Sequence, residues 1–250
     1  MPGTDLPENR VFALDAVQLR LAQGEHPWVA AEREAIAAHW AREQVERPFL
    51  FNGTILLHRG LQLTDGVLSG ASHRAPYAAL LHLVRTAPRA DVAHLFGSAL
   101  ILSSDGAMIL IRMAARTANA GKVYAPAGSL DESDIVDAGV DLDGSMRREV
   151  REETGLDLSH AVAEGRLFAW RSGWLVAVFR RFRLDQPAEQ IAERVRAHIR
   201  TGTEDEIEDV VVVRGPGDAG PTVPPYMRAM IDYHFASPQP VSGWQGSGNH

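Results

Sequence analysis

Hydrophobic residues recur with helical spacing in several segments of this chain. Within residues 26–43, Val29, Ile36 and Trp40 lie on one side of a helix, and charged residues fill the other side. By the same spacing, helices are also predicted for residues 76–85, 187–200 and 225–235.

Short runs rich in β-branched and aromatic residues alternate with turn signals over the rest of the chain. Ala99–Leu102 and Met108–Met113 flank Ser103-Ser104-Asp105-Gly106 and predict a β-hairpin. Further strands are predicted for residues 49–59, 61–69, 166–170, 174–184 and 207–213. From residue 92 onward the order is strands, helix, strands, helix, which favours a mixed α/β or α+β domain over a regular βαβ array.

The polar segment Thr86–Asp91 predicts a boundary between two parts of the chain. We expect a small α+β extension over residues 1–90, a second domain over residues 91–236, and a flexible tail rich in Gly, Ser and Pro over residues 237–250. Apolar runs are too short to span a membrane, and Met1–Arg10 lacks the features of an export signal. We therefore expect a cytoplasmic protein with no membrane partner.

Composition excludes several classes of protein. The chain has 250 residues, with 25 Lys+Arg against 32 Asp+Glu and a net charge of −7, which opposes a general nucleic-acid coat because such a coat needs a basic face. It has no cysteine, which excludes disulfides, thiolate metal sites and a cysteine nucleophile. No GxGxxG opens a helix, and neither the phosphate-binding pattern GxxxxGK[ST] nor the nucleophile pattern GxSxG occurs.

One segment, Arg148–Leu156, concentrates acidic residues in a way that indicates chemistry. On a helix, Glu149, Glu152 and Glu153 share a face because residues three and four positions apart are neighbours. Carboxylates this close repel one another unless a cation lies between them, and hard divalent cations prefer carboxylate oxygens. The segment therefore predicts a platform for a metal-bridged diphosphate.

A second interpretation is a solvated helix face on which Arg148 pairs with Glu152 at i, i+4 spacing. Met146 and Val150 mark a different face, which can pack against a sheet. The context favours the metal site, because a hairpin and an acidic loop precede the helix and Gly155 ends it.

The segment resembles the second half of the signature of Nudix hydrolases, R-E-[apolar]-x-E-E-x-G-[apolar], at every fixed position. Upstream, Pro126-Ala127-Gly128 is similar to the Pro-Gly-Gly that opens this signature, and the resemblance covers roughly residues 95–215. It implies an α+β fold of Nudix type, an α/β/α sandwich with a mixed sheet. It also implies a pyrophosphatase, a hydrolase that cleaves the diphosphate of a nucleoside diphosphate linked to another moiety.

The first half of the signature departs from the family pattern. Gly128 and Arg148 are 20 positions apart, six more than the pattern has. Which acid of this loop pairs with Arg148, if any, stays open. Asp143 is the best candidate for the N-cap of the following helix. The loop acids are Asp131, Glu132, Asp134, Asp137, Asp141 and Asp143.

The resemblance assigns roles to the signature residues. Glu149, Glu152 and Glu153 would ligate Mg²⁺ or Mn²⁺, and Arg148 would orient a carboxylate of the site. The metal would neutralise phosphate oxygens and acidify a water molecule.

The general base has two sources by the same resemblance. It is either Glu149 or an acid from the loop ahead of the strand over residues 207–213, where Glu204 and Glu206 are the candidates. A charged loop with no catalytic part is the alternative for these acids.

The layout of residues 1–90 is similar to that of Nudix enzymes that cleave nucleoside diphosphate sugars, so a sugar-like conjugate is the favoured substrate. Two alternatives stay open: a Nudix-fold protein that binds a nucleotide metabolite without cleaving it, and a nucleoside triphosphate pyrophosphohydrolase. We expect a small nucleotide as partner, no nucleic acid, and a homodimer as one use of the N-terminal part. Trp170, Trp174 and Phe179 fit core packing better than stacking on a base.

Overall fold

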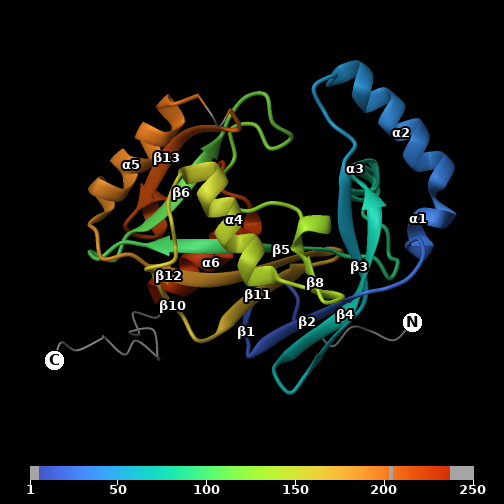
Figure 1. Ribbon diagram of the computed structural model, residues 1–250, viewed down its shortest axis with the longest axis horizontal. Helices are drawn as coiled ribbons and strands as arrows, with labels where there is room; N and C mark the ends of the chain where they lie inside the picture. Colours follow the sequence, from blue (N-terminus) through green and yellow to red (C-terminus); the bar gives the residue numbers. More distant parts are fainter. Residues whose placement is uncertain (1–5, 203–204, 237–250) are drawn as a thin grey trace. The chain divides into compact units, whose positions relative to one another are not determined.

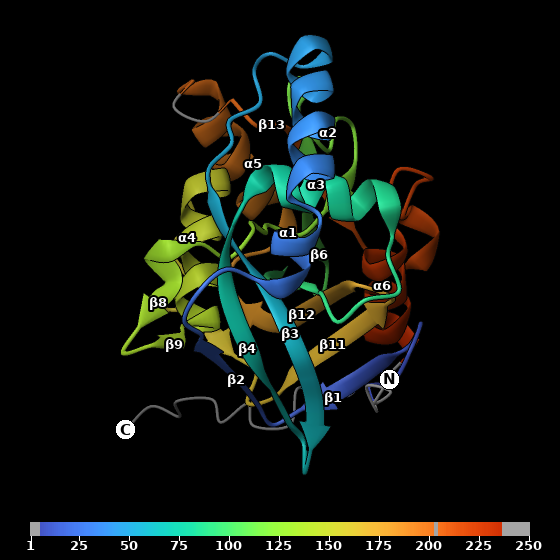
Figure 2. The ribbon, with the colours of Figure 1, turned by 90° about the vertical axis from the view of Figure 1, so that its right-hand side faces the viewer.

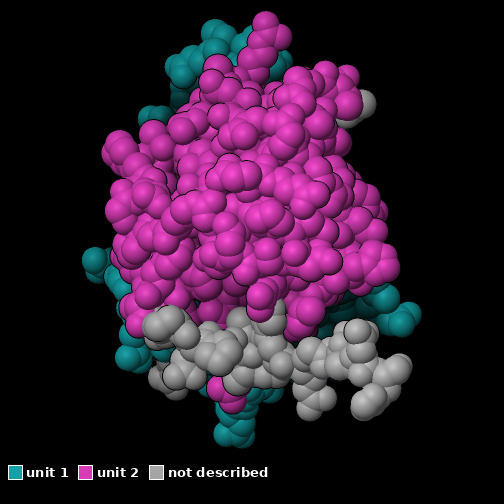
Figure 3. All heavy atoms as spheres, turned by 90° about the vertical axis from the view of Figure 1, so that its left-hand side faces the viewer, with its two compact units in different colours: residues 1–97, 128–145, 169–178 teal, residues 98–127, 146–168, 179–250 magenta. Residues whose placement is uncertain are grey.

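The computed structural model describes residues 6–202 and 205–236 and divides into two compact units. Unit 1 holds the described residues of 1–97, 128–145 and 169–178, and unit 2 holds those of 98–127, 146–168 and 179–250 (Figure 3). Each unit is therefore assembled from segments that are distant in sequence. Glu204 and the predicted tail over residues 237–250 lie outside the described residues.

Unit 1 contains a five-stranded mixed sheet in the order β3-β4-β2-β9-β8. β3 and β4 form an antiparallel hairpin, β2 runs parallel to β4, and β9 runs antiparallel to β2. The strands are β2 (Ala16–Leu21), β3 (Thr54–Thr64), β4 (Val67–Pro76), β8 (Ile135–Val136) and β9 (Gly139–Val140). The helices are α1 (Pro27–Ala31), α2 (Arg33–Glu46) and α3 (Tyr77–Thr86), and β1 (Val11–Leu14) also belongs to this unit.

The predicted helix over residues 26–43 is present as α1 followed by α2, and Val29 and Ile36 are buried as its apolar spacing requires. They join a core that includes Leu57 and Leu83. The predicted break at Gly60 is wrong: β3 passes through this residue, which has a left-handed φ of +59°, with a register shift between Arg59 and Gln62. A bulge absorbs the glycine without ending the strand.

Residues 128–145 are not the plain loop that the sequence predicts. They contain the 3₁₀ turn η1 (Glu132–Asp134) and the hairpin β8–β9. The hairpin turns through Asp137 and Ala138, both with left-handed φ, and the Leu21 N–H donates to the Ala138 carbonyl over 2.9 Å. The extra residues of the signature loop therefore extend the sheet formed by N-terminal strands.

The second sheet has the order β1-β11-β12-β5-β6-β13, with β10 paired to β12 and β7 paired to β6, and its strands β6, β7 and β13 lie in unit 2. The strands are β5 (His94–Leu102), β6 (Met108–Met113), β7 (Val123–Tyr124), β10 (Val162–Ala163), β11 (Leu167–Ser172), β12 (Leu175–Arg183) and β13 (Ile207–Val213). The helices are α4 (Leu142–Thr154), α5 (Ala188–Arg200), α6 (Pro225–Ala236) and the short η2 (Pro216–Asp218). Strands β5, β11 and β12 and helix α4 contribute residues to both units.

Helices α4 and α6 lie on opposite sides of the strands of unit 2 (Figures 1 and 2). Met146 and Val150 of α4 and Met230 and Ile231 of α6 are fully buried, so each helix packs an apolar face inward. The α+β class, the mixed sheet and the helix–sheet–helix arrangement are thus confirmed. No helix within the described ranges is long and apolar enough to cross a membrane.

Candidate functional site

The three glutamates of the signature helix lie on α4 but in unequal environments. Glu149 and Glu153 are 9% and 5% exposed, whereas the Glu152 side chain is 53% exposed. Burying a carboxylate is costly unless charged or hydrogen-bonding groups compensate it. The surroundings of Glu149 and Glu153 are therefore the informative part of this helix.

Arg148 supplies positive charge to two of these carboxylates. Its Nη1 lies 2.8 Å from Glu149 Oε1 and donates over 3.2 Å to Glu152 Oε2. The Arg148–Glu152 pair of the solvated-face interpretation is thus present, together with a contact to Glu149 that this interpretation does not include. Because Glu149 is nearly buried, its contact with the guanidinium matters more than the exposed pair.

Glu153 is held from the turn that opens the signature. The Ala127 N–H donates to Glu153 Oε2 over 3.1 Å, although the two residues are 26 positions apart. The hydroxyl of Ser98 on β5 donates to the Ala125 and Pro126 carbonyls and so holds this turn in place. The two halves of the signature therefore meet at Glu153.

Two tyrosines lie on the same side as Glu153. Burial raises the pKa of Tyr124 and of Tyr226, and the charge of Glu153 raises both further. Their ring centroids are 6.5 Å apart, and Phe179 lies 6.2 Å from the Tyr226 ring. Both phenols keep their protons at neutral pH, and the Tyr124 hydroxyl is hydrogen-bonded to Asn119.

Glu206 belongs to this surrounding as well, because its charge contributes to the raised pKa of Tyr124. It is exposed, it immediately precedes β13, and its carbonyl accepts the Ala114 N–H over 2.7 Å. Of the two loop acids named as candidate bases, only Glu206 is among the described residues, and its role stays a prediction. The sequence did not predict the role of the Ala127 amide, because a backbone N–H leaves no mark in a residue pattern, or that of the two tyrosines, which belong to no recognisable spacing.

The three glutamates of α4 offer the carboxylate oxygens that a hard divalent cation prefers, but their side chains do not converge on one point. Among residues 6–202 and 205–236, no three His, Asp or Glu side chains are grouped so as to hold a metal ion together. The guanidinium of Arg148 contacts one carboxylate oxygen of Glu149 and one of Glu152. The predicted metal ligands therefore stay a prediction.

The N-cap of α4 differs from the sequence prediction. α4 begins at Leu142, so Asp143 lies inside its first turn, and Asp141 Oδ1 accepts the Gly144 N–H over 2.9 Å. Asp141 is therefore the capping residue. The helix begins at Leu142, ahead of the residue that the sequence prediction chose as its N-cap.

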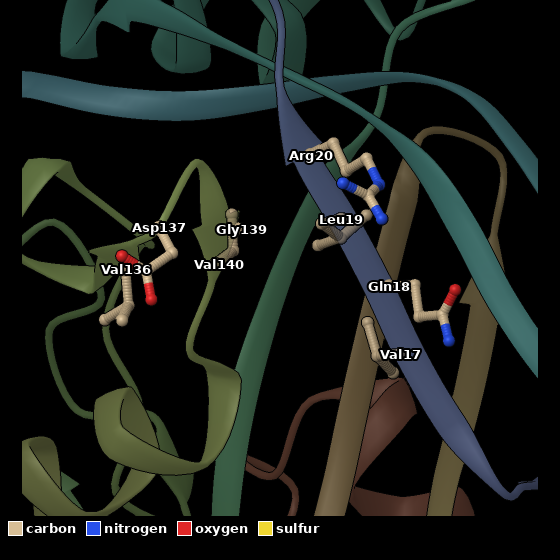
Figure 4. A pocket seen from close by; sticks show the side chains of 8 residues that line it. All are labelled: Val17, Gln18, Leu19, Arg20, Val136, Asp137, Gly139 and Val140. Carbon is tan, nitrogen blue, oxygen red and sulfur yellow. The ribbon is translucent and has the colours of Figure 1, made fainter.

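Unit 1 has a pocket of about 270 Å³ that none of the signature glutamates lines. Figure 4 shows Val17 to Arg20 of β2 on one side and the β8–β9 hairpin on the other. Four of its eight lining residues are aliphatic, and Arg20 and Asp137 are its charged members. The signature loop thus forms one wall of a pocket in unit 1.

No protein-family model and no curated protein matches the sequence. Among solved structures, the chain resembles the MutT protein of Methanosarcina mazei Go1 at 18% identity and a TM-score of 0.37, over 57% of this chain and 92% of that one. It resembles a Nudix hydrolase from Nitrosomonas europaea at 18% identity and a TM-score of 0.36, over 57% and 88%. It resembles NrtR of Shewanella oneidensis at 14% identity and a TM-score of 0.39, over 56% of this chain and 61% of that one.

These solved structures include Nudix proteins, the family whose signature the REVREETGL segment resembles. Roles for individual residues rest on the sequence and geometry of this chain.

Proposed function

We propose that this protein is a Nudix-type pyrophosphohydrolase. It hydrolyses the diphosphate bond of a nucleoside diphosphate linked to another moiety, with a sugar-like conjugate as the favoured substrate. The observation that carries the proposal is the pair of nearly buried carboxylates on α4, Glu149 against Arg148 and Glu153 against the Ala127 amide.

Three carboxylates of like charge lie within two turns of one helix, and two of them are withdrawn from water. A purely structural helix gains nothing from this arrangement, because burying charge costs more than burying an apolar side chain of the same size. A site that binds a cation does gain from it.

Glu149, Glu152 and Glu153 would hold Mg²⁺ or Mn²⁺. When bound, such an ion neutralises phosphate oxygens and lowers the pKa of a coordinated water. A carboxylate, Glu149 or Glu206, accepts the proton of the attacking water as the new P–O bond forms and the anhydride P–O bond breaks. The products are a nucleoside monophosphate and a phosphorylated partner.

Local cations, not the net charge of −7, would attract the anionic substrate. Arg116 and Lys122 follow β6 and precede β7 and are exposed or half-buried side chains of unit 2. The favoured two-part substrate gives binding energy at a distance from the diphosphate, which an enzyme uses to position the reacting bond.

A specific observation supports a second candidate function, binding of a nucleotide metabolite without hydrolysis. In the part of the chain that the structure describes, no three acidic or histidine side chains converge on a metal position, and Arg148 compensates two of the glutamates. A binding protein needs no metal that activates water. Turnover separates the two candidates.

The test measures hydrolysis of a nucleoside diphosphate sugar, ADP-ribose and a nucleoside triphosphate, each with Mg²⁺, Mn²⁺ or EDTA. Mass spectrometry in ¹⁸O-enriched water identifies the products and the attacked phosphorus. We expect metal-dependent cleavage with the highest kcat/KM for the sugar conjugate. A tenfold preference for the triphosphate, about 1.4 kcal/mol in transition-state free energy, contradicts the substrate assignment. Tight binding without turnover favours the second candidate.

A further inference from the structure

The last turn of the signature helix is capped from a different helix. His198 of α5 donates from Nε2 to the Glu152 carbonyl over 3.0 Å. The last four carbonyls of a helix have no partner within the helix, and Glu152 is within that turn of α4. An imidazole from α5 satisfies this carbonyl, next to two of the three signature glutamates.

Gly155, just after the end of α4, also lies close to the His198 ring. Its φ is +67°, a left-handed value that favours glycine, and a Cβ at this position would stand 2.6 Å from Nδ1 and 2.7 Å from Cγ of His198. The glycine of the signature is therefore required here for two independent reasons: the backbone conformation of a helix end and the room for the His198 ring.

The helix that carries His198, α5, is packed firmly within unit 2. Ile191 and Val195 of α5 are fully buried, and α5 packs against β13 and β6. Arg196 also donates to Asp209 on β13 over 3.2 Å. The imidazole is therefore fixed relative to the sheet, and through its hydrogen bond the end of α4 is fixed as well.

We propose that His198 is a positioning residue for the glutamates of the signature helix. It holds the last turn of α4 in the place from which Glu152 and Glu153 can ligate a divalent cation, and it does not itself touch the metal or the substrate. This inference rests on the proposed function, because it concerns the same carboxylates.

The experiment compares His198→Ala with His198→Gln, whose side-chain amide can still donate near the position of Nε2. Arg194→Ala, an exposed residue on the same helix, is the matched control. Mn²⁺ binding is measured without substrate, from the EPR signal of free Mn²⁺, and kcat and the Mg²⁺ requirement are measured separately.

Loss of a residue that orients a metal ligand typically costs 10- to 100-fold in metal affinity. Because His198 acts through a backbone carbonyl, we expect His198→Ala to weaken Mn²⁺ binding by about tenfold. We expect His198→Gln to stay within about threefold of the wild type, since one donor bond of similar geometry remains. Arg194→Ala should bind Mn²⁺ as the wild type does.

A double-mutant cycle with Gly155→Ala keeps the inference testable if His198→Ala folds poorly. Gly155→Ala places a methyl group against the imidazole, and removing the ring relieves the contacts with Nδ1 and Cγ but leaves the 3.0 Å contact with Cβ of residue 198 and the strained φ. We expect Gly155→Ala/His198→Ala to bind Mn²⁺ more tightly than the product of the two single effects predicts.

Two results overturn the inference alone: wild-type Mn²⁺ affinity in His198→Ala, or a lowered melting temperature with unchanged Mn²⁺ affinity, which means a purely structural role. Additive effects in the cycle also contradict it. If the wild type neither binds Mn²⁺ nor cleaves any substrate, the proposed function fails, and the inference fails with it.

Discussion

At the scale of single residues, the signature glutamates are distinguished by what surrounds them. Glu153 is buried, accepts a backbone N–H from Ala127 and lies near two protonated phenols, whereas Glu152 is half exposed and pairs with Arg148. Equal positions in a sequence pattern therefore do not imply equal contributions to stability.

Replacing Glu153 by Gln should abolish turnover while the fold persists. The amide keeps an oxygen that can accept the Ala127 N–H, but it removes the charge that a cation requires. We expect kcat to fall by about a hundredfold or more, equivalent to about 3 kcal/mol in the barrier. Steady-state kinetics with Mg²⁺ measure this, and circular dichroism checks the fold.

Glu152→Gln should give a similar loss of kcat with an even smaller change in stability, because its side chain is half exposed. Glu193→Gln, an exposed acid on α5, is the control and should retain full activity. Normal metal-dependent activity in both signature variants would refute the assignment of these glutamates as ligands.

At the scale of elements, the start of α4 depends on one capping side chain. Asp141 Oδ1 accepts the Gly144 N–H, and a Cβ on Gly144 would stand 2.3 Å from Asp141 Oδ2. The glycine therefore leaves the space that the capping carboxylate uses. This cap lies between the β8–β9 hairpin and the signature glutamates and sets where the helix begins.

Asp141→Ala should lower the free energy of unfolding by about 1 kcal/mol, the usual effect of losing an N-cap. Asp143→Ala should cost less, because a first-turn carboxylate contributes about 0.3–1 kcal/mol through the helix dipole. Urea unfolding at pH 7.5 measures both. A larger loss for Asp143→Ala would restore the sequence-based choice of Asp143 as the cap.

At the scale of the whole molecule, several buried histidines make stability depend on pH. Burial lowers the pKa of His26 to about 4, of His58 to about 3 and of His94 to about 4, all in unit 1. In unit 2, burial and then the charge of Arg181 lower the pKa of His234 to about 4. Each of these rings is neutral in the folded protein at neutral pH.

Stability should therefore fall as the pH drops below about 6.5, where the unfolded chain takes up protons that the folded protein does not. The loss continues until the pH reaches the folded pKa values near 4 and 3. Between pH 7.5 and 5, each such histidine should cost about 2 kcal/mol. Unfolding free energies from urea titrations at the two pH values measure the total.

A variant identifies the source of this pH dependence. His94→Gln should reduce the difference between pH 7.5 and 5, whereas the exposed His160→Gln should leave it unchanged. If the wild type is equally stable at both pH values, protonation of these histidines is not coupled to unfolding as expected.

Metal binding should also change the stability of the whole protein. If a divalent cation binds only the folded state, Mn²⁺ at about 100 times its Kd stabilises that state by about 2.7 kcal/mol. We expect the melting temperature to rise with Mn²⁺, to fall back with EDTA, and to respond little in Glu153→Gln. A melting temperature independent of Mn²⁺ would mean that no such site forms on α4.

The sequence by itself determined the helices whose apolar residues recur at helical spacing, and the signature segment Arg148–Leu156. Residues 187–200 and 225–235 formed helices where apolar positions recur every three or four residues, because such spacing buries one face of a helix regardless of the partner. The acidic face of α4 follows likewise from helix geometry alone.

Only the tertiary structure decided which distant residues contact these helices and where the short strands β8 and β9 form. The two-residue strands β8 and β9 are too short to show a period, and they form because β2 offers a sheet edge. The contacts of Ala127 with Glu153 and of His198 with Glu152 join residues 26 and 46 positions apart. No local pattern encodes such contacts, because they depend on how β5 and α5 pack, which is a property of the whole core.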